Sequence, residues 1–172
     1  TLESNEGLCF YSTLEHENKN GITFIKNTEL LIFGNHNLQN MHAAMLVCKE
    51  LGVSEDDFLK KISSFKGASK RLELVKKENS SAIYKDFAHS PSKLKATSTA
   101  MIKQFSDRKL VACIELHTFS SLNEEFLSQY KGSMDGPDTA IVYFSPESIA
   151  HKKLNPITKQ KVYSSFGRKD NE

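Results

Sequence analysis

The alternation of apolar strand segments with helical segments in the second half of the chain most constrains its fold. Strands are predicted at Arg71–Lys76, Ala82–Phe87, Leu110–Leu116 and Thr139–Phe144. The intervening helices are predicted at Pro91–Phe105 and Asn123–Lys131. Because apolar strands that alternate with helices are typical of βαβ units, the pattern predicts an α/β fold with a mainly parallel, Rossmann-like sheet. We expect that sheet to be either truncated or closed by a strand at Lys161–Phe166.

The first part of the chain differs, because three short β segments precede its helices. The segments are predicted at Leu8–Ser12, Ile22–Lys26 and Glu29–Phe33. Polar, turn-prone residues separate them, as in an antiparallel meander. This change of pattern divides the chain into residues 1–69 and residues 70–172.

Two helices are predicted after the meander. The first covers Leu38–Leu51, with Asn37 as its N-cap and Gly52 just beyond its end. The second starts with a capping-box-like sequence at Ser54 and ends at Gly67. Its apolar face is predicted to consist of Phe58, Ile62 and Phe65.

Composition and charge exclude several classes of protein. The 172 residues include 23 basic and 21 acidic side chains, and a net charge of +2 is too balanced for a nucleic-acid-binding footprint. No apolar run is long enough to cross a bilayer, so neither a nucleic acid nor a membrane is expected as a partner. The cysteines follow no zinc-binding spacing and are expected to be buried free thiols of a reducing, cytoplasmic compartment. They are Cys9, Cys48 and Cys113.

Two polar clusters stand where helices are predicted to begin. Residues 34–40 (GNHNLQN) include His36, Asn37 and Asn40, and residues 86–91 (DFAHSP) lie between a strand and a helix. Free backbone N–H groups at a helix N-terminus favour anionic or polar ligands. Imidazole and amide groups can also read the edge of a heterocycle. The plain alternative is that Asn37 only caps its helix.

Further polar residues follow the predicted parallel strands, at the edge where open α/β sheets bind ligands. They are Asp86, His89 and Ser90 after one strand, Glu115 and His117 after the next, and Ser145 and Glu147 after the third. Asp86 could accept hydrogen bonds from a ribose, and His89 could donate to an oxyanion or position a substrate. The alternative is that Ser90 caps a helix that begins at Pro91, which leaves Asp86 and His89 as ordinary loop residues.

Arg71 lies near the boundary between the two parts and offers a planar guanidinium to a phosphate. A surface ion pair with Glu73 or Glu78 is the equal alternative on sequence alone. The chain contains no GxxxxGK[ST] loop to cradle phosphates, and no metal-binding residues are predicted within it. No GxGxxG follows the Ala82–Phe87 strand, which excludes a dinucleotide-binding domain.

Three motifs, taken in order, resemble those of the Mur ligases, the ATP-dependent amide ligases of bacterial peptidoglycan assembly. They are residues 34–40 (GNHNLQN), residues 65–67 (FKG) with residues 70–73 (KRLE), and residues 86–91 (DFAHSP). The resemblance covers nearly the whole chain. It implies that residues 1–69 end the ATP-binding central domain and that residues 70–172 belong to a Rossmann-like C-terminal domain, which is expected to be truncated.

Within the family, two stretches resemble the recycling enzymes, which join L-Ala-γ-D-Glu-meso-diaminopimelate to UDP-N-acetylmuramate. They are residues 86–89 (DFAH) and residues 115–120 (ELHTFS). Enzymes that add L-alanine alone are the near alternative, but they carry arginines where Thr118 and Ser121 stand here. The departure favours the peptide-adding interpretation.

The resemblance also implies roles for single residues. ATP would be bound by His36, Asn37 and Asn40 on its adenosine side, by Arg71 at the phosphates and by Asp86 at the ribose. His89 would act as the catalytic residue near the reacting groups. Substrate contacts would come from His117 and from Ser90, where the family often has a second histidine. Paired arginines are usual in the family where Lys70 and Arg71 stand here.

The implied reaction turns the muramyl carboxylate into an acyl phosphate, from which the incoming amine displaces phosphate. Mg²⁺ and cations would stabilise the developing charge. The resemblance implies that the phosphate loop and the metal ligands lie before Thr1, and the fragment alone is therefore predicted to be inactive. The absence of an initiator methionine agrees with a sequence cut from a longer protein. A non-catalytic Mur-like binding module is the alternative function. An intact GK[ST] loop upstream would favour the enzyme.

Overall fold

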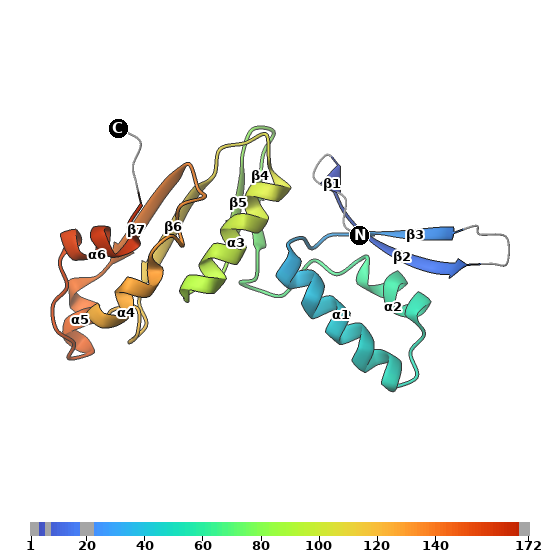
Figure 1. The fold of residues 1–172 in the computed structure, drawn as a ribbon, viewed down its shortest axis with the longest axis horizontal. Helices are drawn as coiled ribbons and strands as arrows, with labels where there is room; N and C mark the ends of the chain where they lie inside the picture. The colour runs from blue at the N-terminus through green and yellow to red at the C-terminus, as the bar shows by residue number, and fades with distance from the viewer. Residues whose placement is uncertain (1–3, 6–7, 18–22, 169–172) are drawn as a thin grey trace. The chain divides into compact units, whose positions relative to one another are not determined.

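The chain forms two compact units, residues 1–85 and residues 86–172 (Figure 1). The computed structural model describes residues 4–5, 8–17 and 23–168, with side chains from residue 28 onward. The hairpin that follows residue 69 groups with the first unit by its contacts. The division at residues 69 and 70 remains a prediction about the domains of the family.

The first unit begins with an antiparallel sheet, as predicted. The strands predicted at Ile22–Lys26 and Glu29–Phe33 are in fact one continuous strand, Thr23–Leu30, because Asn27 and Thr28 pair with the preceding strand and form no turn. Strands β1 (Ser4–Asn5), β2 (Leu8–Glu17) and β3 (Thr23–Leu30) form one sheet in the order β1-β2-β3. Helices α1 (Asn35–Glu50) and α2 (Glu55–Ile62) follow and pack together (Figure 1). The buried side of α1 consists of Leu38, Met41 and Met45.

Helix α1 starts earlier than predicted, and Asn37 is not its N-cap. The cap is Gly34, whose φ of 89° suits a glycine. Asn37 lies in the first turn instead, where its side-chain amide donates a 2.9 Å hydrogen bond to the Phe33 carbonyl. Gly52 follows the helix as predicted, with a φ of 84°.

Helix α2 begins as predicted and ends before the predicted residue. The Ser54 hydroxyl accepts a 3.1 Å hydrogen bond from the Asp57 amide. The helix ends at Ile62 and not at Gly67, because the hydroxyls of Ser63 and Ser64 bind the Lys60 and Lys61 carbonyls. Leu59, which is 3% exposed, replaces the predicted Phe65, 42% exposed, as the deepest apolar contact.

Strands β4 (Glu73–Lys77) and β5 (Ala82–Lys85) form an antiparallel hairpin, which corrects the expectation of a third parallel strand at Ala82–Phe87. The Glu78 amide donates to the Ser81 carbonyl at 2.7 Å across the turn. So short a connection permits a hairpin but no parallel crossover, which needs a dozen residues or more.

The second unit has the predicted α/β pattern. Helix α3 (Pro91–Gln104) leads to β6 (Val111–Leu116), and β7 (Thr139–Phe144) pairs with β6 in parallel, with Val111 opposite Thr139. Between these strands lie α4 (Glu124–Leu127) and the 3₁₀ turn η1 (Ser128–Tyr130). Helices α5 (Pro146–His151) and α6 (Lys159–Phe166) follow.

Helix α6 corrects the expected strand at Lys161–Phe166. The Thr158 hydroxyl accepts a 3.1 Å hydrogen bond from the Lys161 amide and so caps the helix. Val162 and Phe166, four residues apart, share the buried side, which is the spacing of a helix. An ion pair of 2.7 Å between Lys161 and Glu124 joins α6 to α4.

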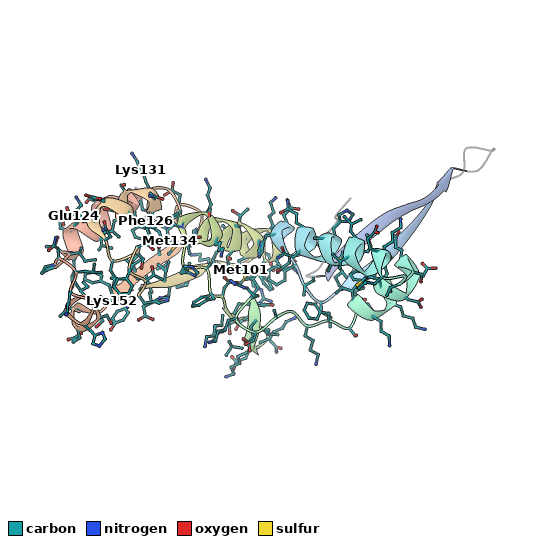
Figure 2. The ribbon with its side chains drawn as sticks, turned by 90° about the horizontal axis from the view of Figure 1, so that it is seen from below. Met101, Glu124, Phe126, Lys131, Met134 and Lys152 are labelled. Atoms are coloured by element: carbon teal, nitrogen blue, oxygen red, sulfur yellow. The ribbon has the colours of Figure 1, made fainter. Side chains whose placement is uncertain are left out.

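A buried cluster in the second unit covers one face of the β6–β7 pair. Its members include Leu94, Ile114, Leu116, Leu127, Tyr130, Met134 and Phe166. Phe126 and Met134 lie toward this cluster, whereas Lys131 projects outward (Figure 2). Alternate strand residues point to the other face. There Val111 and Tyr143 are 62% and 56% exposed.

The cysteines differ from the expectation that all are buried. Cys113 lies on the uncovered face of β6 and is exposed, while Cys48 is half-buried. Both are free thiols, as expected. The Cys9 side chain lies outside the described residues.

Candidate functional site

Phe87 brings together two of the predicted site residues in the second unit. Its ring lies 4.9 Å from the ring of His89 and 5.9 Å from that of His117, measured between centroids. His89 directly precedes the α3 N-cap and His117 directly follows β6, so both strand-end loops contribute. Both imidazoles are half-buried. These two loops therefore lie together within this unit, although the strand before His89 is not part of the parallel sheet.

Each of these imidazoles is oriented by a backbone carbonyl. Nδ1 of His89 lies 3.0 Å from the Phe87 carbonyl, and Nδ1 of His117 lies 3.1 Å from the Glu115 carbonyl. Because a carbonyl oxygen only accepts, Nδ1 carries the hydrogen in both rings. With the hydrogen on Nδ1, Nε2 is the ring atom that can accept a proton. His89 and His117 can therefore each accept a proton from a substrate at Nε2.

Tyr130 fixes the His89 loop from the core. Its hydroxyl donates a 2.6 Å hydrogen bond to the His89 carbonyl, although 41 residues separate the two. The Tyr130 side chain is 0% exposed and stacks on Phe166, with ring centroids 5.0 Å apart. Burial raises the pKa of the Tyr130 hydroxyl, which therefore stays a donor at neutral pH.

Ser90 and Asp86 flank His89 in the same loop. Ser90 is the N-cap of α3 by backbone geometry, but its hydroxyl makes no capping hydrogen bond, and Pro91 fills the first turn. The plain alternative, in which Ser90 caps a helix that begins at Pro91, is thus confirmed for the position of the cap, but the Ser90 hydroxyl takes no part in it. Asp86 is half-buried at the start of the unit. A substrate or ribose contact by either residue remains a prediction.

The turn after His117 is closed by hydroxyl groups. The Thr118 hydroxyl donates to Ser121 Oγ at 2.8 Å, and the Thr118 amide donates to the same oxygen at 2.9 Å. Ser121 is 2% exposed. The turn, residues 118–121 (TFSS), therefore presents no cation of its own. Phe119, within this turn, is exposed, and the Lys152 Nζ atom lies over its ring, 4.5 Å from the centroid.

Ser145 and Glu147, after β7, have a structural role. The Ser145 hydroxyl accepts from the Ser148 amide at 3.2 Å, so it caps α5, and it donates to Glu147 at 2.6 Å. That hydrogen bond lowers the pKa of the Glu147 carboxyl. No group of three or more metal-ligating side chains occurs among the described residues.

In the first unit, His36 and Asn40 lie on the same side of α1. They are four residues apart in the first turns of the helix, His36 half-buried and Asn40 exposed. Asn37 uses its amide hydrogen toward Phe33, which leaves its side-chain oxygen as an acceptor. These three residues of the motif at 34–40 thus share the N-terminal part of one helix.

Arg71 lies in a turn with left-handed backbone. Lys70 and Leu72, on either side of it, have φ values of 56° and 48°, which only glycine adopts without strain. The Arg71 side chain is exposed, and no hydrogen bond or ion pair joins it to another side chain in residues 28–168. The two acids named as alternative partners are occupied. Glu78 pairs with Lys76 at 2.6 Å, and Glu73 binds the turn.

The sequence analysis considered Glu73 only as an ion-pair partner of Arg71 and missed its contacts with the turn. Its Oε2 atom accepts 2.7 Å and 3.2 Å hydrogen bonds from the Lys70 amide and the Ser69 hydroxyl. Those two bonds, in that order, lower the pKa of the Glu73 carboxyl, and the charges of Lys85 and Lys70 add to the effect. Tyr130 was also missed, because nothing local in the sequence signals its contact with His89.

The chain is similar in sequence to known ligases. The UDP-N-acetylmuramate--L-alanine ligase of Caldicellulosiruptor bescii is 35% identical over 144 residues, which cover 84% of this chain and 31% of that protein. The enzyme of the same name from Desulfitobacterium hafniense is 29% identical over 136 residues, or 79% of this chain and 30% of the relative. The chain thus spans about a third of the length of these relatives. No family model matches it.

Solved structures share the fold. The UDP-N-acetylmuramate-alanine ligase of Thermotoga maritima superposes with a TM-score of 0.60 at 17% identity, over 87% of this chain and 31% of that one. The folylpolyglutamate synthase of the same organism gives 0.55 at 20% identity, over 86% and 33%. Within the described residues, no helix is long and apolar enough to cross a membrane.

Proposed function

We propose that this chain, which belongs to the Mur ligase family, is the C-terminal portion of a ligase that uses ATP to join UDP-N-acetylmuramate to an amine substrate. The relatives it matches are named for ligation of UDP-N-acetylmuramate. The single observation that carries the proposal is the pair His89 and His117, two half-buried imidazoles around Phe87 with oriented proton acceptors. Because its proposed substrates are nucleotides, we also propose that the ligase is cytoplasmic.

For ATP, the first unit offers groups of the right chemistry. His36, the Asn37 side-chain oxygen and Asn40 suit the edge of an adenine, which carries both donors and acceptors. Arg71 suits the phosphates, because its exposed guanidinium presents a planar set of donors. Asp86, which belongs to the second unit, is assigned to the ribose hydroxyls. Mg²⁺ is proposed as a further cofactor. The described residues contain no group of three or more metal-ligating side chains.

The residues of the second unit suit the amide-forming step. The muramyl carboxylate takes the γ-phosphoryl group of ATP, and the amine attacks the resulting acyl phosphate, forming a C–N bond and releasing phosphate. The amine must lose a proton during this attack. We assign that proton to Nε2 of His89, with His117 and Ser90 orienting the amine substrate. Fixed geometry would supply most of the acceleration.

The amine substrate is proposed to be the peptide L-Ala-γ-D-Glu-meso-diaminopimelate. Free alanine carries a carboxylate beside its amine, whereas the alanine of a peptide carries an amide carbonyl there. A carboxylate calls for a cation. The turn beside His117 is closed by the hydroxyl groups of Thr118 and Ser121 and contributes none of its own, and the Lys152 ammonium nearby lies over the Phe119 ring. That chemistry favours the peptide and a role in recycling of cell-wall peptides.

Addition of L-alanine is the second candidate, favoured by the names of the relatives in the sequence comparison. The two are separated by phosphate release from the full-length ligase, with ATP, Mg²⁺, UDP-N-acetylmuramate and either the tripeptide or L-alanine. We expect turnover with the tripeptide and at most a few per cent of it with alanine. Equal or faster turnover with alanine would assign the second activity, and no turnover with either would point to a binding module.

The 172-residue chain alone is expected to release no phosphate in that assay. It contains no phosphate-cradling loop, and the described residues contain no metal cluster. The chain therefore serves as the negative control for the full-length protein.

A further inference from the structure

We propose that Glu73 is a positioning residue for Arg71, acting by holding the backbone of the turn that presents the guanidinium. This inference rests on the proposed function, in which Arg71 binds the phosphates of ATP. The turn comprises residues 67–73, all within the first unit. Glu73 itself touches no substrate in this proposal.

The turn needs an anchor because its backbone conformation is unfavourable for the residues it contains. Lys70 and Leu72 both have positive φ values, 56° and 48°, and neither is a glycine. Left-handed backbone costs side-chain-bearing residues free energy, and such residues persist only where surrounding structure imposes them. Leu72 is buried, at 7% exposed, so one end of the turn is held by packing.

The other end is held by Glu73. One carboxylate oxygen accepts from the Lys70 amide at 2.7 Å and from the Ser69 hydroxyl at 3.2 Å. The Arg71 amide donates to the Ala68 carbonyl at 3.1 Å, which closes the turn from inside. Hydrogen bonds to an ionised carboxylate are among the stronger ones. Arg71 therefore stands on a backbone that Glu73 fixes directly on its N-terminal side.

The arrangement also keeps Arg71 from the nearest acid. A carboxylate two residues away would ordinarily pair with the guanidinium. Here the Glu73 oxygen binds the Lys70 amide, and Arg71 has no side-chain partner among the described residues. The Glu73 carboxylate thus holds the backbone of the turn, and the Arg71 guanidinium is available for an anionic ligand.

A double-mutant cycle in the full-length ligase tests the proposal, with Arg71→Ala, Glu73→Ala and the double variant. Arg71→Ala should raise KM for ATP by about tenfold or more, and Glu73→Ala by about fivefold, with little change in KM for UDP-N-acetylmuramate. In the Arg71→Ala background, Glu73→Ala should have no further effect on ATP. Glu73→Gln, which keeps an acceptor oxygen, should recover most of the affinity.

The controls separate the possible failures. Glu78→Ala removes a neighbouring exposed acid that binds Lys76, and it should leave KM for ATP unchanged. Additive effects of the two alanine substitutions, or a normal KM in Glu73→Ala, would overturn the positioning role alone. A normal KM for ATP in Arg71→Ala would instead overturn the nucleotide role in the proposed function. If Glu73→Ala does not fold, Ser69→Ala, which removes the second hydrogen bond to the Glu73 carboxylate, measures the coupling with Arg71 instead.

Discussion

The proposed site residues of the two units are held in place by different means. In the second unit, His89 is fixed through Tyr130, a fully buried side chain of the core, and its ring packs on Phe87. In the first unit, Arg71 depends on a local turn closed by the neighbouring Glu73. A site fixed by the core should fail together with the stability of its unit. A site fixed by a turn can lose function while the fold persists.

The largest expected effect is that of Tyr130→Ala, which tests the role of the core. Removing this 0%-exposed ring should destabilise the second unit by about 3–5 kcal/mol. Native-state hydrogen exchange of the β6 amides should show the loss as faster exchange. Tyr143→Ala, at a side chain that is 56% exposed, is the matched control and should change stability by less than about 0.5 kcal/mol. Equal effects of the two would refute a core anchor.

Arg71→Ala tests the opposite case, loss of function without loss of fold. In the full-length ligase, kcat/KM for ATP should fall by about 100-fold, or about 2.7 kcal/mol of transition-state stabilisation. The melting temperature should stay unchanged because the side chain is exposed. Arg108→Ala, another exposed arginine, which lies over Phe105, is the control. A fall in melting temperature that accounts for the lost activity would show that Arg71 is structural.

Arg168 extends the comparison, because it holds a loop of the second unit from a distance in sequence. Its guanidinium donates to the carbonyls of Met134, Pro137 and Asp138 at 2.8, 2.7 and 2.8 Å. Arg168→Ala should cost about 2–3 kcal/mol of stability, since charged hydrogen bonds are lost and carbonyls are left unpaired. Urea unfolding measures the change. Arg168→Lys should recover only part of it, because a single ammonium cannot bind three carbonyls in this geometry.

Tyr130→Phe isolates the hydroxyl from the ring. At neutral pH, losing the hydrogen bond to the His89 carbonyl should cost about 1 kcal/mol. Burial raises the pKa of Tyr130, so its protonated form stabilises the fold fully below the ordinary value of 10. That contribution is lost as pH rises through the higher pKa of the folded state.

The test is the pH dependence of the stability of the wild-type protein and of Tyr130→Phe. Between pH 8 and 11, the wild-type protein should lose stability that Tyr130→Phe does not lose, so the difference between them should shrink. Urea unfolding at each pH measures it. Tyr143→Phe should keep the wild-type profile, and a constant difference across this range would contradict the buried hydroxyl.

Hydrophobic periodicity and capping residues in the sequence predicted several helices and strands correctly. The parallel pair β6–β7, the start of α3 at Pro91 and the Ser54 cap of α2 follow from periodicity and capping, and all are observed. The helix at Lys159–Phe166 was mistaken for a strand, because a short apolar segment has no clear period. Asn37 was taken for a cap because the sequence does not reveal that Gly34 adopts positive φ one turn earlier.

Two candidate site residues were predicted in position, whereas their roles remain predictions and the contacts that hold them were not foreseen. His89 and His117 were expected at strand ends, and their rings meet around Phe87. The hydrogen bond from Tyr130 to the His89 carbonyl spans 41 residues, and no local pattern encodes a contact so distant in sequence. The role of Glu73 depends on the positive φ values of Lys70 and Leu72. The sequence does not reveal such backbone angles at residues other than glycine.

The smallest expected effect, that of Lys70→Gly, separates backbone strain from side-chain contacts. Glycine accepts the φ of 56° without the clash of a Cβ atom, so the substitution should stabilise the turn by about 0.5–1 kcal/mol despite its entropic cost. Lys77→Gly, in β4, is the matched control and should destabilise. Hydrogen exchange of the β4 and β5 amides measures both. Because Glu73 binds the amide of residue 70 and not its side chain, KM for ATP should be retained in Lys70→Gly. A rise in KM there would assign phosphate binding to the Lys70 ammonium and weaken the case that the strained turn exists to present Arg71.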